Sequence, residues 1–124
     1  MDARGGVALA AGTAPLLTPA FALPARHVLH VTGPALRRGQ PRPTAAQDAQ
    51  LAAAYRGCLD AACGAGLRSI AFCCISTGIF GFPQERAAAI ALRTTREWLD
   101  AQEQEWALDA VLFDVHAARR GAVY

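Results

Sequence analysis

The sequence predicts an α/β domain, because runs typical of buried strands alternate along the chain with runs that have the period of a helix. Two further observations support this class. The run Ile70 to Ile75 is almost continuously apolar, as in a strand covered on both faces. The order strand, helix, strand, helix, strand favours parallel pairing with right-handed crossovers. With 124 residues the chain can form one domain, so residues 1–124 are treated as a single unit.

The first half of the chain contains a predicted strand, a loop and a predicted helix. The strand is His27–Thr32 (HVLHVT), and residues 33–43 form a loop rich in Gly and Pro. Thr44 with Gln47 three residues later is a capping-box pattern, which predicts that a helix begins there. Its apolar stripe consists of Leu51, Tyr55, Cys58 or Leu59, and Ala62, and it ends at Gly64 or Gly66.

The second half repeats this order with two strands around a helix. The predicted strands are Ser69–Ile75 (SIAFCCI) and Ala110–His116 (AVLFDVH). Pro83 suits a first helical position and Glu85 favours the positive end of the helix dipole. The predicted buried stripe of this helix is Ala88, Leu92, Thr95 and Leu99, and it continues towards Gln102.

The charge of the chain is too weak to indicate a nucleic-acid or membrane partner. All twelve basic residues are Arg, and the formal net charge is +2. Arg37, Arg38 and Arg42 are expected to belong to a solvated loop. No segment has 18 continuous apolar residues, and Gly12 and Pro15 interrupt the apolar N-terminal run that weakly resembles a secretory signal. We therefore expect a cytoplasmic protein, with residues 1–11 disordered.

Neither the cysteines nor the histidines have the spacing of a metal site. Cys58, Cys63, Cys73 and Cys74 form no CxxC pair, and we expect all four to be reduced, small and buried. The adjacent pair should point to opposite faces of its strand. The histidines are His27, His30 and His116, which lie in strands or at their edges and are expected to have packing roles. The sequence thus predicts no metal and no cofactor.

The most informative segment is Ser69 to Glu85, in which a strand leads through a glycine-containing turn into a helix. Ligands of open α/β sheets bind beyond the carboxyl ends of the strands, where such a turn directs several backbone N–H groups the same way. Gly78 and Gly81 allow a close approach of backbone to ligand, and the following helix adds its partly positive N-terminus. Ser76 and Thr77 add hydroxyls at the same point.

A phosphate held by backbone amides is the interpretation that remains after two better-known motifs are excluded. The glycine-rich NTPase loop requires a Lys, which the chain lacks, and a GxGxxG motif requires a third glycine at the right spacing. Spacing alone leaves a structural alternative open, because most glycine turns between a strand and a helix bind nothing.

A resemblance to a known family favours the binding interpretation. The segments LPARHVLHVTGP (Leu23 to Pro34) and SIAFCCISTGIFGFP (Ser69 to Pro83), then an Ala-rich helix and VLFDV (Val111 to Val115), resemble macrodomains. The wording FCCISTG is most similar to the branch with bacterial zinc-dependent protein-ADP-ribose hydrolases. The resemblance implies a three-layer α/β/α fold with a mixed, mainly parallel sheet, here truncated at its N-terminus.

The resemblance also implies a ligand and its contacts. The loop of Ser76, Thr77, Gly78, Ile79, Phe80 and Gly81 would wrap the diphosphate of ADP-ribose, free or attached to a protein. Phe80 would cover the distal ribose, and Gly78 would be the closest backbone approach. Asp114 would lie on the adenine side.

Macrodomain enzymes resemble one another in an N-terminal stretch with two strands, an Asn-bearing loop and a Gly-rich loop. Most of this stretch has no counterpart in the chain. The chain contains no Asn, so the catalytic Asn of the family is missing, and so are the ligands of the zinc branch. The resemblance thus implies a missing central strand, so that the sheet would have an unpaired gap or a rearranged strand order. An unpaired sheet edge is one through which the chain could self-associate. No catalytic residue is assigned. Three functions stay open, namely ADP-ribose binding, ADP-ribosyl hydrolysis by another group such as Asp114, and a truncated gene product without function.

Overall fold

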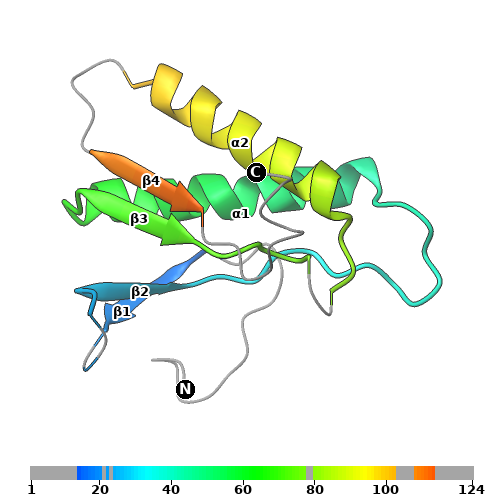
Figure 1. Cartoon of the computed structure of the whole chain (residues 1–124), viewed down its shortest axis with the longest axis horizontal. Coiled ribbons are helices and arrows are strands. Elements are labelled where there is room, and N and C mark those ends of the chain that lie inside the picture. Colours follow the sequence, from blue (N-terminus) through cyan, green and yellow to red (C-terminus); the bar gives the residue numbers. More distant parts are fainter. Residues whose placement is uncertain (1–13, 21, 23, 78–79, 103–107, 114–124) are drawn as a thin grey trace.

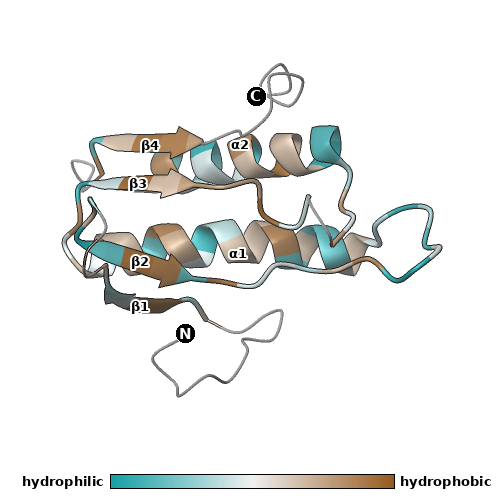
Figure 2. Ribbon diagram, turned by 60° about the horizontal axis from the view of Figure 1, so that its bottom comes forward, coloured by the Kyte–Doolittle hydropathy of each residue, from teal (hydrophilic) through white to brown (hydrophobic). Residues whose placement is uncertain are grey.

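The computed structural model describes residues 14–20, 22, 24–77, 80–102 and 108–113, which form four short strands and two helices (Figure 1). Figure 2 shows both helices behind the four strands, so the described residues form two layers. The expected third layer is not found among them. Among the described residues, neither helix combines the length and the apolar character that crossing a membrane requires.

The first two strands form an antiparallel pair. They are β1 (Leu16–Pro19) and β2 (His27–His30), and Leu16 lies opposite His30 while Pro19 lies opposite His27. A hydrogen bond of 2.9 Å between Thr18 Oγ1 and His30 Nε2 crosses the pair. β1 was not predicted from the sequence, because four residues that include a Pro give a weak strand pattern. The predicted strand His27–Thr32 is shorter than expected, ending at His30.

The other two strands form a parallel pair, as the order of elements predicts. They are β3 (Ser69–Phe72) and β4 (Ala110–Phe113), aligned with Ser69 opposite Ala110. The expected extension of β3 to Ile75 is wrong, since β3 ends at Phe72 and residues 73–75 lie outside the strand. Cys73 is exposed, contrary to the expectation that all four cysteines are buried. The predicted residues 114–116 of the last strand lie outside the described residues.

The first helix, α1 (Ala45–Gly64), begins where the capping box predicts. The Thr44 side chain accepts a hydrogen bond from the backbone N–H of Gln47, and the Gln47 side chain accepts one from the backbone N–H of Thr44. The predicted stripe is confirmed and includes both alternatives given for one position, since Cys58 and Leu59 are each buried. This stripe faces the core shared with α2.

The second helix, α2 (Gln84–Asp100), has Pro83 at its N-cap position and no side-chain cap. Its buried face is broad and consists of Ala87, Ala88, Ile90, Ala91, Thr94, Thr95 and Trp98. The prediction that Leu92 belongs to the buried stripe is wrong, since this side chain is 43% exposed. The true stripe is centred on Ala91 and Trp98, which rotates Leu92 by about 100° away from its centre. The helix also ends two residues before Gln102.

The core lies between the two helices and the β3–β4 pair. Tyr55 of α1 packs edge-on against Phe72, with ring centroids 4.9 Å apart, and Phe72 stacks on Phe113 at 5.7 Å. The helices are joined at the side by a hydrogen bond of 2.7 Å from Trp98 Nε1 to the Asp60 carboxylate. These contacts fix β3, and therefore the loop that follows it, relative to both helices.

The two strand pairs do not form one continuous sheet in the described residues. No ladder joins β2 to β3, although the arrows of β2, β3 and β4 run in the same direction (Figure 2). Within the described residues, the break between the two pairs lies between β2 and β3.

Candidate functional site

The loop that follows β3 is closed by its own backbone. The Phe82 N–H donates to the Ser76 carbonyl at 2.9 Å, which brings the two ends of the loop together. Ser76 has a φ of 65° and Gly81 a φ of 78°. The left-handed region costs a residue with a β-carbon about 1–2 kcal/mol, so a serine in this conformation is held there by its surroundings.

A second loop, at the end of β2, holds the first one in place. A β-carbon built on Gly33 would lie 2.3 Å from Ser76 Oγ and 2.5 Å from Ile75 Cγ2, so any other residue here would require these side chains or their loop to shift. Further along, the Leu36 N–H donates to the Phe80 carbonyl at 2.9 Å. The loops from two different strand pairs are therefore locked together at both ends of the turn.

Hydroxyl groups lie at the base of the site. Ser76 Oγ is buried and has no hydrogen-bond partner within the described structure. Thr77 Oγ1 donates to the Cys74 carbonyl at 3.1 Å. The Ile75 N–H donates to the Tyr55 hydroxyl at 3.4 Å, which ties the end of β3 to α1. An unpaired buried hydroxyl costs free energy and is uncommon, so Ser76 Oγ is a candidate ligand contact.

The amino end of α2 lies at the end of the same loop. Because no side chain caps this helix, its first backbone N–H groups have no side-chain acceptor. Arg86 in its first turn makes a bidentate ion pair with Asp48 in the first turn of α1, with Arg86 Nε 2.9 Å from Asp48 Oδ1. Gln84 Nε2 is a second buried polar atom without a partner in the described residues.

The predicted site residues are only partly described. Ser76, Thr77, Phe80 and Gly81 belong to the loop, and Phe80 is 36% exposed. Gly78, Ile79 and Asp114 lie outside the described residues. Gly33 was not among the predicted site residues. Its position in the run VTGP, directly after a predicted strand, is the same signal that identified the glycines of the other loop.

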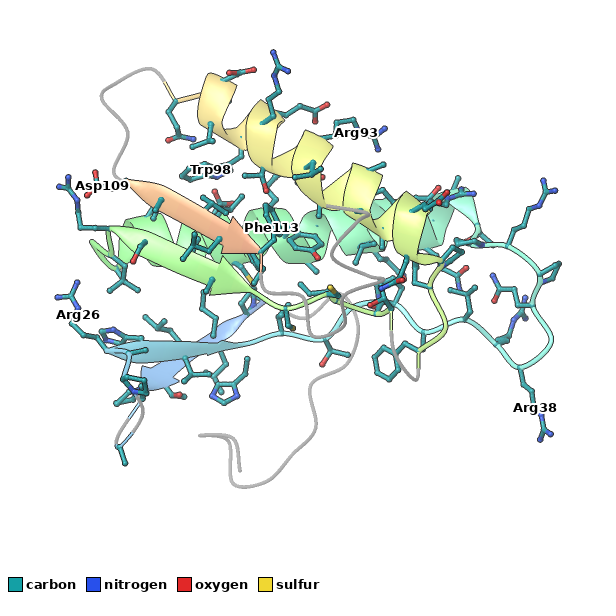
Figure 3. All side chains as sticks on the ribbon, viewed as in Figure 1. Arg26, Arg38, Arg93, Trp98, Asp109 and Phe113 are labelled. Atoms are coloured by element: carbon teal, nitrogen blue, oxygen red, sulfur yellow. The ribbon has the colours of Figure 1, made fainter. Side chains whose placement is uncertain are left out.

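The basic loop is separate from this site. Arg37, Arg38 and Arg42 are exposed, and Figure 3 shows Arg38 directed away from the body of the molecule. The expectation of a solvated loop is confirmed for these three residues.

The described residues hold no group of three or more His, Cys, Asp or Glu side chains that could bind a metal ion. Cys58 is buried in α1, and this burial, with a smaller contribution from the neighbouring Cys73, raises the pKa of its thiol to about 12. A thiol that stays protonated is a poor metal ligand and nucleophile. Cys58 therefore has a packing role.

Comparison with known proteins identifies the family. The macro domain family model matches residues 3–91. ADP-ribose glycohydrolase MACROD1 of Rattus norvegicus is 42% identical over 87% of this chain, and protein-ADP-ribose hydrolase of Treponema medium is 42% identical over 91%. The crystal structure of the Trypanosoma brucei macrodomain in complex with ADP-ribose superposes with a TM-score of 0.75 at 39% identity over 89% of the chain. The chain belongs to the macro domain family.

The similarity covers only part of each relative. The chain spans 40% of the rat protein, 41% of the T. medium protein and 43% of the T. brucei structure. Residues 3–91, which the family model matches, contain both loops of the site described above.

Proposed function

We propose that this protein binds ADP-ribose, free or attached to a protein, and that the loop of residues 76–82 holds the diphosphate through backbone N–H groups. The main support for this proposal is the hydroxyl of Ser76, which is buried and has no hydrogen-bond partner among the described residues. Ser76 has a left-handed backbone conformation and packs against Gly33. A bound phosphate oxygen would accept a hydrogen bond from this hydroxyl, and the preformed loop would lose little conformational entropy on binding.

Electrostatics support an anionic ligand at this loop. The uncapped amino end of α2 supplies a partial positive charge next to residues 80–82. Its only acidic residue in the first turn is Glu85, which is exposed. A diphosphate has the charge and the acceptor oxygens that such an end of a helix favours. The T. brucei relative, whose structure contains ADP-ribose, supports the choice of ligand.

Calorimetric titration of the folded protein with ADP-ribose tests this proposal. Gly78→Val should abolish binding, because a branched side chain blocks the close approach of the ligand to the backbone. Arg37→Ala is the matched control and should bind as the natural protein does, since Arg37 is exposed on the other loop. Absence of heat at millimolar ligand, or equal losses in the two variants, would contradict the proposal.

Hydrolysis of ADP-ribosyl bonds is the second candidate function, because both curated relatives named above are hydrolases. The FCCISTG motif and the similarity to the T. medium protein support the bacterial protein-ADP-ribose hydrolase branch. The rat ADP-ribose glycohydrolase has the same sequence identity to this chain, 42%, so the identities alone do not favour either branch. The described residues do not fit the zinc ion of that branch, so we derive no step through a metal. Activity would depend on the same loop, with Asp114 or the ligand phosphate positioning the water.

Release of ADP-ribose from a modified protein distinguishes hydrolysis from binding alone. If the chain is a hydrolase, release should exceed the rate of a buffer control and should fall in Gly78→Val. Binding of ADP-ribose without its release from a modified protein would agree with the binding function and exclude hydrolysis.

A further inference from the structure

A peptide group in the loop after β2 contacts both the start of α1 and the loop of residues 76–82, which we call the ligand loop. It joins Ala35 to Leu36, and its carbonyl accepts a hydrogen bond from Gln47 Nε2 at 3.3 Å. Its N–H donates to the Phe80 carbonyl at 2.9 Å. No peptide bond of the described chain is cis, and in a trans peptide group the C=O and the N–H point in opposite directions. This group therefore bridges the Gln47 side chain and the ligand loop.

The next peptide group in this series of hydrogen bonds joins Phe80 to Gly81. Because the Phe80 carbonyl points towards Leu36, the Gly81 N–H points away from it. This N–H has no acceptor among the described residues. Gly81 has a φ of 78°, which glycine adopts without the steric cost of a β-carbon. A backbone donor is thus oriented within the loop for which we propose diphosphate binding.

The Gln47 side chain joins the start of α1 to the loop after β2, and Figure 1 shows these two segments on one side of the molecule. Its Oε1 accepts from the Thr44 N–H at 2.9 Å and from Gln40 Nε2 at 2.6 Å. Because the Thr44 N–H only donates and the Ala35 carbonyl only accepts, the oxygen and nitrogen of the Gln47 amide have fixed places. The acceptor side of this amide caps α1, and the donor side holds the loop.

We infer that Gln47 is a positioning residue for ligand binding, an inference that rests on the proposed function of the ligand loop. Its amide donor sets the direction of the peptide group before Leu36, and that group in turn holds the one before Gly81. Without this donor the Ala35 carbonyl is free to turn, and the Leu36 N–H turns with it, since both belong to one planar group. The Gly81 N–H then loses the preorganised direction that favours binding.

Gln47→Glu separates the two roles of this side chain. A carboxylate still accepts from the Thr44 N–H and keeps the capping box, but it cannot donate to the Ala35 carbonyl and repels it. ADP-ribose should therefore bind about fivefold more weakly, the effect of roughly one hydrogen bond. Gln47→Ala is neutral and loses the same donor, so a similar weakening there would exclude the added charge as the cause. Calorimetric titration of the full chains measures both affinities.

Thr44→Ala and Gln50→Glu are the matched controls. Thr44→Ala removes the hydroxyl that caps α1 but keeps the backbone N–H that donates to Gln47. It should lower the urea midpoint of unfolding and leave ADP-ribose binding unchanged, whereas a role of Gln47 in stability alone predicts that both variants weaken binding. Gln50→Glu adds the same charge at an exposed position of α1 and should bind ADP-ribose as the natural protein does.

Hydrogen exchange of the Leu36 amide tests the first step of the inference without ligand. This N–H is bonded to the Phe80 carbonyl, and its exchange is compared with that of the amide of Leu59, which is buried in α1. Relative to Leu59, the Leu36 amide should exchange faster in Gln47→Glu than in the natural protein. The same ratio should be unchanged in Thr44→Ala.

The inference is overturned by any of three results. They are ADP-ribose binding by Gln47→Glu equal to that of the natural protein, an equal loss of affinity in Thr44→Ala, and a Leu36 exchange ratio that Gln47→Glu does not change. Absence of heat with the natural protein would contradict the proposed function itself, and this inference with it. The two kinds of failure are distinguishable, because only the second is seen in the natural protein.

Discussion

Gly33 connects the two loops of the site, so its replacement is the most direct test of their arrangement. In Gly33→Ala the new β-carbon would lie 2.3 Å from Ser76 Oγ, and the loop after β3 must move. We expect weaker ADP-ribose binding and a loss of about 1–3 kcal/mol in the free energy of unfolding, as for other overpacked positions. Calorimetry and urea denaturation measure the two effects.

Gly64→Ala provides the control for this change. Gly64 ends α1, has no atoms within 4 Å of a built β-carbon and does not have a positive φ. Its replacement should leave ligand binding unchanged. If Gly33→Ala binds ADP-ribose as well as Gly64→Ala does, the two loops do not act together.

Cys58 makes the stability of the protein sensitive to alkaline pH. Burial raises the pKa of this thiol from 9.0 to about 12, so between these values the unfolded chain has released a proton that the folded chain keeps. The free energy of unfolding should therefore fall as pH rises from about 9 to about 12. Urea denaturation at about pH 8 and about pH 10.5 should show a smaller fall in Cys58→Ala than in the natural protein.

At the scale of single elements, the start of α1 depends on the capping box. Thr44→Ala should lower the free energy of unfolding by about 1 kcal/mol, the usual effect of losing an N-cap side chain. Gln47→Ala should cost more, because its side chain also donates to the Ala35 carbonyl and to Gln40 in the preceding loop. Denaturation of the two single variants and the double variant measures this. A double variant equal to the sum of the singles would contradict a coupled cap.

How well each element could be predicted depended on how local its signal is. Both helices follow from nearby residues, since Thr44 with Gln47 and Pro83 with Glu85 mark their starts. Leu92 was misplaced because a stripe of Ala and Thr leaves the rotation of α2 undefined. Contacts with α1, such as that of Trp98 with Asp60, fix this rotation in the structure. β1 could not be recognised from four residues ending in Pro19.

The residues of the site also divide into those with a local sequence signal and those whose role depends on a contact between distant parts of the chain. The glycine turn after β3 is a local signal and was recognised, although Gly78 and Ile79 lie outside the described residues. The role of Gly33 depends on its distance from Ser76, across 43 positions of sequence, and no pattern in one chain contains such a distance.

At the scale of the whole molecule, the two strand pairs meet at the ligand loop. They approach each other at the Gly33–Ser76 contact, whereas no ladder joins β2 to β3 in the described residues. The ligand loop therefore lies where the two strand pairs are held together.

Pro19 limits how far the strands of this protein can extend into larger assemblies. The backbone nitrogen of Pro19 lies on the edge of β1 that faces away from β2, and it carries no hydrogen. A further strand that paired with this edge would therefore lose a hydrogen bond at that position. Pro19→Thr should restore the donor and increase association with protein concentration, as measured by sedimentation velocity, and unchanged sedimentation would argue against this role. Proline at this position therefore interrupts the row of donors that pairing of another chain with the outer edge of β1 would require.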